Sequence, residues 1–232
     1  MNLASLFSGG KDSTFAIYLM EQQGHTVDYL VSVIPSNPDS WLFHTPNLHL
    51  LPLHARAMEK TLISIESDGT EESDLFALRE ILSDLEVDGI ITGAIASDYQ
   101  WDRVNSVCED LGIRVFSPLW RKNELTVLRE EIGAGIKSII VSVSAEGLGP
   151  SYLGKEINDD ILTSLLSLHS RYRVNVSGEG GEYETFVIDS PLHRASIKLL
   201  DVATEIHRDR SRLTIKKAVL ERCRNAATSF QS

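Results

Sequence analysis

Short apolar runs alternate with amphipathic helical segments along residues 1–120 of the chain. This alternation is typical of βαβ units, in which helices connect parallel strands and cover both faces of one sheet. We therefore expect an α/β fold built on a doubly wound parallel sheet. The expected strands span Leu3–Ser8, Tyr29–Ile34, Thr61–Ile65, Gly89–Thr92 and Ile113–Phe116, and the expected helices span Ser13–Gln23, Leu53–Lys60, Glu71–Leu85 and Asp98–Leu111.

The pattern changes after about residue 122, where strands begin to follow one another without a helix between them. Such a run is typical of an α+β unit. We predict two domains, 1–125 and 126–232, although the boundary could fall anywhere from Arg121 to Lys137. The expected helices of the second unit are Glu124–Ile132 and Ile157–Ser170, and its expected strands are Ser138–Val143, Thr185–Ile188, Ser196–Val202 and Leu213–Val219.

The chain is acidic, with 22 Lys and Arg against 33 Asp and Glu and a formal net charge of −11. Because neutralising phosphates requires clustered basic residues, we do not expect it to bind nucleic acid. A local exception is the basic run from His207 to Arg212, followed by Lys216 and Lys217. This run predicts either a solvated face or a docking patch for an acidic partner.

Cysteine content and hydropathy predict a cytoplasmic protein that does not associate with a membrane. No segment approaches the ~18–20 consecutive apolar residues of a transmembrane helix. The N-terminus lacks a basic region followed by a long apolar stretch, so we expect no signal peptide. The two cysteines, Cys108 and Cys223, form no CxxC pair, which argues against a zinc ribbon or a disulfide framework. Cys108 lies in the apolar part of a helical segment and is expected in the core.

The segment from Ser8 to Ser13, with the sequence SGGKDS, lies between the first expected strand and the first expected helix. Two glycines allow the backbone to approach an anion closely, and the amides of a helix N-terminus favour negative charge. The Lys11 ammonium and the two serine hydroxyls add further groups that would bind phosphate. A simple strand–helix turn would need neither the lysine nor both serines. The spacing also differs from the GxxxxGK[ST] pattern of a Walker A loop, because here the glycines are adjacent.

Two further segments follow expected strands. Gly93–Asp98 comes after the fourth strand, and its small residues leave room for a nucleotide where parallel strands end. Asp98 is expected to cap the next helix, and a small-residue turn with such a cap is the simpler alternative. His44, in the sequence FHTPN, follows the second strand and is expected either to contact a ligand or to be a polar surface residue.

The segment 178–184 holds three glycines and three glutamates in seven residues. Glu179, Glu182 and Glu184 could converge on a cation, for which the glycines would allow a tight backbone. A solvated acidic hairpin is the alternative, and a Mg²⁺ site is another, since hard carboxylates suit that ion.

The SGGKDS segment resembles the phosphate loop of the ATP pyrophosphatase (PP-loop) superfamily. The chain as a whole resembles one family within it, the diphthine–ammonia ligase (diphthamide synthetase) family. This resemblance covers residues 5–192. It is carried by SGGKDS (8–13), FHTPN (43–47), GAIASDYQ (93–100), SPLW (117–120), GEGGEYETFVID (178–189) and SPL (190–192).

The family resemblance implies a PP-loop fold and a reaction. ATP would adenylate the carboxylate of diphthine on translation elongation factor 2, and ammonium would supply the nitrogen that converts the acyl-adenylate to diphthamide, AMP and pyrophosphate. Lys11 would neutralise the departing pyrophosphate, and Asp12 would hold Mg²⁺ or fix the loop. The glutamates and Tyr183 would face the quaternary ammonium of diphthine. One glutamate would instead deprotonate ammonium, and we expect Glu182, although the sequence does not order the three.

These expectations define two sets of binding residues, with a homodimer left open. The expected ATP-binding residues are Ser8, Gly9, Gly10, Lys11, Asp12, Ser13, Val33, Gly93, Ala94, Ile95, Ser97 and Asp98, of which Val33 is chosen because the second strand should end beside the first. The expected diphthine-binding residues are His44, Thr45, Tyr99, Asn175, Gly178, Glu179, Gly181, Glu182, Tyr183 and Glu184.

Two other functions fit the sequence less well. Another PP-loop enzyme, such as a tRNA-thiolating or lysidine-forming ligase, would fit poorly with the acidic charge, and thiolation usually needs catalytic cysteines that are absent here. A nucleotide-binding regulatory protein without turnover would not need Lys11 or the glutamate cluster.

Overall fold

The computed structural model describes residues 1–36 and 46–222 and contains two sheets. The first sheet has five parallel strands in the order β3-β2-β1-β4-β5. The predicted doubly wound α/β fold is confirmed. The strands are β1 (Asn2–Leu6), β2 (Thr26–Pro35), β3 (Thr61–Ser67), β4 (Gly89–Ile91) and β5 (Arg114–Phe116), and the helices between them are α1 (Lys11–Gln22), α2 (Leu51–Met58), α3 (Glu71–Ser83) and α4 (Asp98–Leu111).

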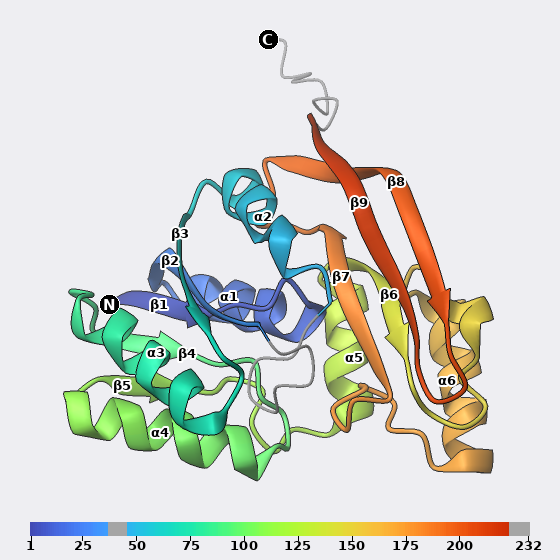
Figure 1. The fold of residues 1–232 in the computed structure, drawn as a ribbon, viewed down its shortest axis with the longest axis horizontal. Helices are drawn as coiled ribbons and strands as arrows, with labels where there is room; N and C mark the ends of the chain where they lie inside the picture. Colours follow the sequence, from blue (N-terminus) through green and yellow to red (C-terminus); the bar gives the residue numbers. More distant parts are fainter. Residues whose placement is uncertain (37–45, 223–232) are drawn as a thin grey trace, which may run out of the picture.

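The second sheet is antiparallel, with the order β7-β6-β9-β8, and lies beside the first (Figure 1). Its last two strands in the sequence form a long hairpin. Both strands are longer than the predicted Ser196–Val202 and Leu213–Val219. Short one-turn 3₁₀ helices, η1 (Leu48–Leu50) and η2 (Pro150–Tyr152), complete the fold. The strands are β6 (Lys137–Val143), β7 (Tyr183–Asp189), β8 (Ala195–Ile206) and β9 (Ser211–Arg222), and the helices are α5 (Glu124–Gly133) and α6 (Asp159–Tyr172).

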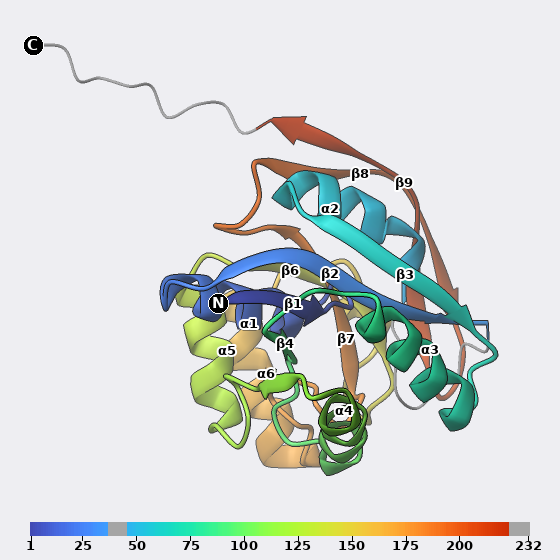
Figure 2. The same cartoon turned by 90° about the vertical axis from the view of Figure 1, so that its left-hand side faces the viewer.

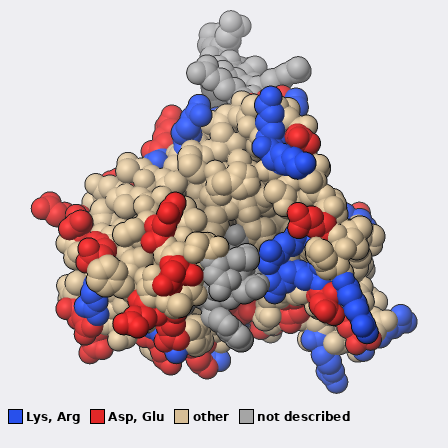
Figure 3. Space-filling view, viewed as in Figure 1, with Lys and Arg blue, Asp and Glu red and all other residues tan. Residues whose placement is uncertain are grey.

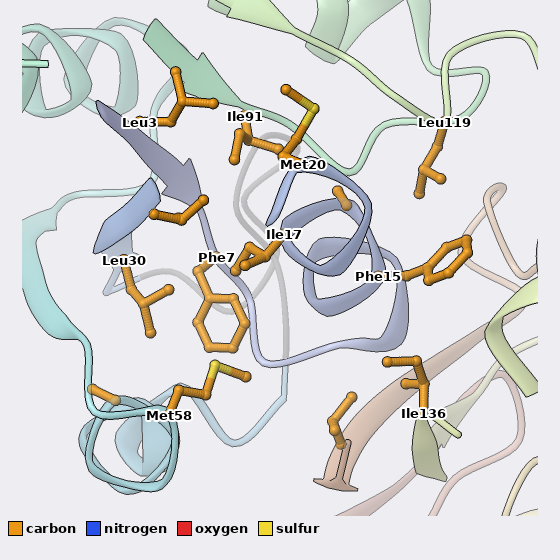
Figure 4. Close-up of a cluster of buried hydrophobic side chains, with 14 of the residues drawn as sticks. Leu3, Phe7, Phe15, Ile17, Met20, Leu30, Met58, Ile91, Leu119 and Ile136 are labelled. Atoms are coloured by element: carbon orange, nitrogen blue, oxygen red, sulfur yellow. The ribbon is translucent and has the colours of Figure 1, made fainter. Parts of the chain in front are cut away.

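Helices cover both faces of the parallel sheet (Figure 2). On one face, α3 and α4 pack against β1, β2 and β4 in a cluster that includes Leu78, Val104 and Cys108. Cys108 is fully buried there, as expected of a core residue. On the other face, Phe15, Ile17 and other residues of α1 pack with α2 (Figure 4). Such apolar stripes fix each helix because burial removes their surface from water.

The core under α1 is continuous with the second sheet. The same cluster that holds Phe15 and Ile17 also contains Val127 of α5, Ile136 and Val187 of β7. The two sheets are therefore joined by shared packing. The division into domains 1–125 and 126–232 stays a prediction. Within residues 1–36 and 46–222, no helix is long and apolar enough to cross a membrane.

Two buried histidines lie at the junction between the sheets. His54 of α2 is fully buried, and its ring centroid is 5.7 Å from that of His193, which follows β7. The Nδ1 atom of His193 is 2.6 Å from Ser190 Oγ. Burial lowers the pKa of His54 well below its usual value, and burial lowers the pKa of His193 to about 4, although Asp189 opposes this. Both rings are therefore neutral at pH 7.

We expect the free energy of unfolding to decrease as the pH falls from 7 to 5. The unfolded chain protonates histidine near pH 6.5, whereas folded His193 stays neutral until about pH 4. The stabilisation is thus present above pH 6.5 and is lost below it, by about 2 kcal/mol at pH 5 for His193 alone. Urea denaturation at a series of pH values would measure this slope.

His193→Asn should flatten the slope, whereas His207→Asn, at an exposed histidine in the β8–β9 turn, should leave it unchanged. An unaltered slope in His193→Asn would show that other groups cause the acid sensitivity.

Candidate active site

A cavity of about 690 Å³ opens where strands β1, β2 and β4 end. The strand order reverses at β1 and β4, which is where open α/β sheets usually bind ligands. The second sheet closes the opposite side, with residues from β6, β7 and the β8–β9 turn. The cavity is therefore built by both halves of the chain, and its volume suits a nucleotide or a substrate of similar size.

The phosphate loop is organised by its own serines. Gly9 has a positive φ of 78°, a conformation that favours glycine, and a side chain there would press on His54. The Ser8 hydroxyl accepts a hydrogen bond from the Gly10 amide at 3.3 Å and lies 3.2 Å from the Ser13 hydroxyl. Ser13 also donates to the Gly10 carbonyl. The serine hydroxyls therefore stabilise the loop conformation.

Lys11 lies beneath the loop, almost completely buried. Its Nζ atom is 2.6 Å from Asp12 Oδ1 and 3.7 Å from Glu131 Oε2 of α5. Burial opposes its charge, but these two acidic groups raise the pKa of Lys11, so it is an ammonium ion. Burial raises the pKa of Glu131 well above its usual value despite the pull of Lys11, which favours the protonated acid.

The turn after β4 packs directly on the phosphate loop. A Cβ atom on Gly93 would lie 2.7 Å from the backbone nitrogen of Ser13, so only glycine fits. Ser97, and not the predicted Asp98, caps α4, accepting a hydrogen bond from the Gln100 amide. Asp98 is exposed and pairs with Arg121 at 2.5 Å, because it already belongs to the first helical turn.

Glu179 bridges the two halves of the site. Its Oε1 atom accepts hydrogen bonds from the backbone amides of Ile95, Ala96 and Ser97 at 2.9, 2.8 and 3.1 Å. Three successive amides at a helix start form a strong site for a carboxylate. Burial raises the pKa of Glu179, while the amides of Ala96 and Ile95 oppose that rise.

The other two glutamates of the segment point in different directions. Glu184 lines the cavity, and burial together with the Asp12 carboxylate raises the pKa of Glu184 to about 8, with Lys11 and Arg210 opposing. The Glu182 side chain does not reach the cavity lining. Its Oε1 atom accepts a hydrogen bond from the Asn175 amide at 3.1 Å, so it folds back under its own loop.

Asn175 and Tyr183 also hold this loop together. The Asn175 side chain accepts hydrogen bonds from Ser177 and donates to Glu124, which turns it away from the cavity. Tyr183 is buried at the cavity wall, its hydroxyl donates to the Val176 carbonyl at 2.7 Å, and Lys11 Nζ lies 5.9 Å from its ring centroid. With a cation already near the ring, Tyr183 offers little of its face to a second one.

The structure brings most of the predicted residues together. His44 and Thr45 lie outside the described residues. The backbone of Gly9 and Gly10 shapes the phosphate loop, and the Ile95 amide donates a hydrogen bond to Glu179. None of these three residues lines the cavity. The other predicted residues that do not line it are Asp98, Asn175 and Glu182. The predicted residues that line it are Ser8, Lys11, Asp12, Ser13, Val33, Gly93, Ala94, Ser97, Tyr99, Gly178, Glu179, Gly181, Tyr183 and Glu184.

Sequence reasoning missed Arg210, Thr185, Ser142 and Gln100, which also line the cavity. Arg210 lies in the β8–β9 turn, within the basic run that predicted either a solvated face or a docking patch. Figure 3 shows basic side chains near the ends of β8 and β9 and acidic ones over α3 and α4. No local pattern in the sequence places Arg210 at the cavity, because its position depends on the pairing of β8 with β9.

Among the described residues, no group of three or more His, Cys, Asp or Glu side chains could hold a metal ion by itself. Mg²⁺ usually binds to one or two carboxylates together with substrate phosphates. Asp12 fits that arrangement, because it lies on the phosphate loop and its side chain is partly exposed to the cavity.

Comparisons with known proteins agree over most of the chain. The family model "Diphthamide synthase N-terminal domain" matches residues 1–115, and "Diphthamide synthase C-terminal domain" matches residues 123–220. A Mus musculus protein named diphthine–ammonia ligase is 36% identical over 220 residues, covering 85% of this chain and 82% of that protein. Proteins of the same name from Homo sapiens and Danio rerio are each 35% identical, covering 89% and 90% of this chain and 86% and 90% of theirs.

A solved structure, described as a predicted subunit of tRNA methyltransferase from Methanocaldococcus jannaschii, aligns with a TM-score of 0.46 and 16% identity. The alignment covers 82% of this chain and 98% of that one. This likeness is too distant to bear on function.

Gly93→Ala should damage both stability and nucleotide binding, because its Cβ would collide with the phosphate-loop backbone at Ser13. We expect a loss of about 1–3 kcal/mol in the free energy of unfolding and about tenfold weaker Mg·ATP binding. Urea denaturation and titration calorimetry would measure the two effects.

Gly149→Ala is the matched control, since a Cβ there meets no atom within 4 Å. Equal ATP affinity in Gly93→Ala and the wild-type chain would mean that the turn after β4 does not shape the nucleotide site.

Proposed function

The chain belongs to the diphthamide synthase family, and from this membership and the geometry of the cavity we propose that it is a diphthine–ammonia ligase. It uses ATP to convert the carboxylate of diphthine to the amide of diphthamide. The observation that carries this proposal is a phosphate loop and two cavity carboxylates, Glu179 and Glu184, brought into one cavity by the two sheets.

ATP occupies the side of the cavity formed by the parallel sheet. The amides of the phosphate loop and the Lys11 ammonium bind the phosphates that leave as pyrophosphate, and Lys11 neutralises the charge that develops on them. Asp12 would hold Mg²⁺ together with phosphate oxygens of ATP, and the ion would supply further charge neutralisation. The apolar wall at Leu6, Val31 and Val33 suits adenine.

The reaction proceeds by two displacements. A carboxylate oxygen of diphthine attacks the α-phosphorus, and the bond from that phosphorus to the bridging oxygen breaks, releasing pyrophosphate. The nitrogen of ammonia then attacks the acyl carbon, and the bond to the AMP oxygen breaks. Adenylation is required because a free carboxylate has no good leaving group. Ammonium must lose one proton before its nitrogen can attack and another as the amide forms.

Glu184 is a better candidate than Glu182 for the base that removes the first proton from ammonium. Glu184 lines the cavity near Asp12 and Lys11, and its pKa of about 8 makes it a stronger base than an ordinary glutamate. Glu182 instead binds the backbone of its own loop. The carboxylates of Glu179 and Glu184 also supply the negative charge that a quaternary ammonium group needs, since such a group cannot donate a hydrogen bond.

Membership in the family supports proposals for the protein substrate, the nitrogen source and the location of the reaction. The protein substrate is the diphthine form of translation elongation factor 2, the nitrogen comes from free ammonium, and the reaction takes place in the cytoplasm. A homodimer stays a prediction. The acidic net charge of −11 and the acidic faces of α3 and α4 support a protein substrate over a nucleic acid.

The reaction itself can be tested with the purified chain, Mg·ATP, an ammonium salt and elongation factor 2 that carries diphthine. We expect AMP to form in step with a mass loss of about 1 Da in the modified histidine peptide, the change from carboxylate to amide. Mass spectrometry and AMP quantitation would be the readouts. AMP without the mass change would mean a different acceptor, and neither product would refute the proposal.

Glu184→Gln should lower the rate with ammonium by about 100-fold or more, because general base catalysis typically contributes that much. In the wild-type enzyme the same rate should rise with pH through a midpoint near pH 8, as Glu184 loses its proton. Hydroxylamine is uncharged at neutral pH and needs no prior deprotonation, so it should restore most of the activity of Glu184→Gln.

Glu182→Gln is the matched control and should retain activity, since a glutamine can still accept the Asn175 amide. If Glu182→Gln loses the ammonium reaction and Glu184→Gln does not, Glu182 is the base.

A further inference from the structure

Three side chains outside the phosphate loop form a network at the start of α3 and α4. The Tyr99 hydroxyl donates to Glu71 Oε2 at 2.5 Å. The Arg103 guanidinium lies 3.5 Å from the centroid of the Tyr99 ring. Arg103 also binds Glu71 through two hydrogen bonds, from Nε at 2.7 Å and from Nη2 at 3.2 Å. The ring is therefore held from one face and from its hydroxyl.

The network holds Tyr99 as a wall of the cavity. Tyr99 lines the cavity, whereas Glu71 and Arg103 line a separate groove between α3 and α4. The Tyr99 ring therefore lies between the ion pair and the cavity. This placement leaves the side of Tyr99 away from Arg103 available to a ligand.

Tyr99 belongs to the apolar end of the cavity. Val104, five residues further along α4, also lines the cavity and packs in the same hydrophobic cluster as Val31 and Val33 of β2. Glu184 lies instead on β7, in the wall of the cavity formed by the second sheet. A ligand group that contacts Tyr99 is thus close to the end of β2.

The Arg103 guanidinium beside Tyr99 determines which kind of ligand group can bind on the other face of the ring. A guanidinium already faces one side of the ring, so a quaternary ammonium on the other side would place two cations across one π system. A neutral planar base has no such penalty and gains from stacking on an aromatic ring. Adenine fits this wall better than the cationic head of diphthine, although Tyr99 was predicted among the diphthine-binding residues.

We propose that the Glu71–Arg103 ion pair positions Tyr99 to stack on the adenine of ATP, which makes Glu71 and Arg103 positioning residues for nucleotide binding. The proposal rests on the proposed use of ATP. It assigns the ring to the nucleotide and leaves the acceptor's cation to the cavity carboxylates, of which Glu184 lies on the second sheet.

Titration calorimetry with Mg·ATP and with Mg·tripolyphosphate separates the base from the phosphates. Tyr99→Ala should weaken ATP binding about tenfold, the usual scale of one stacked base, and should leave tripolyphosphate binding unchanged. Arg103→Met and Glu71→Gln should weaken ATP binding to a smaller extent, about threefold, because they only release the ring. Tyr99→Phe keeps the ring and should stay within about twofold of the wild-type chain.

The matched control is Arg79→Met. Arg79 pairs with Asp110 between the same two helices, away from the cavity, so this variant should bind ATP normally. In the ligase assay, the KM for ATP should rise in Arg103→Met while the KM for the diphthine-bearing protein stays constant.

Several outcomes would overturn the assignment. They are unchanged ATP affinity in Tyr99→Ala, equal losses for ATP and tripolyphosphate, or a rise only in the KM for the protein acceptor. If the wild-type chain binds neither ligand, the proposed function fails as well; if it binds ATP and these variants do not differ, only this inference fails.

Discussion

The phosphate loop is held in place by the second sheet, and the rest of the site depends on that contact. The amide of Val187 in β7 donates to the Gly9 carbonyl at 2.9 Å, and the amide of Lys11 donates to the Thr185 hydroxyl at 3.1 Å. Val187 also packs with α1 in the core. A loop that ends one strand of the parallel sheet thus completes its hydrogen bonds on a strand of the other. The anion site therefore exists only when both halves have folded together.

Glu179 adds a second link across the same cavity. Its carboxylate satisfies three amides at the start of α4, which would otherwise need water or a ligand. With Gly93 pressed against the loop backbone at Ser13, the two strand ends and the acidic segment are fixed relative to one another. A site held this way needs little rearrangement when its ligand binds, and such preorganisation is what makes electrostatic stabilisation effective.

Sequence reasoning identified the fold and the residues of the cavity better than it identified their individual roles. The strand–helix alternation and the position of SGGKDS predict the parallel sheet and the loop, because both depend on local patterns. Choosing among Glu179, Glu182 and Glu184 depends on where β7 begins and on which amides are free at the start of α4. Arg210 reaches the cavity only because the β8–β9 hairpin folds over it. Such contacts join residues far apart in the chain, so no local pattern contains them.

The charged groups in the cavity influence one another because the segment 178–184 and the phosphate loop lie side by side. Burial and the carboxylates of Asp12 and Glu179 raise the pKa of Glu184, while Lys11 and Arg210 oppose that rise. The phosphates of bound ATP add negative charge and favour the protonated form of Glu184 further. An acceptor that brings a fixed positive charge acts in the opposite sense and stabilises the ionised carboxylate. In the proposed reaction, arrival of the cationic acceptor thus also prepares Glu184 to take a proton from ammonium, which couples recognition of diphthine to activation of the nucleophile.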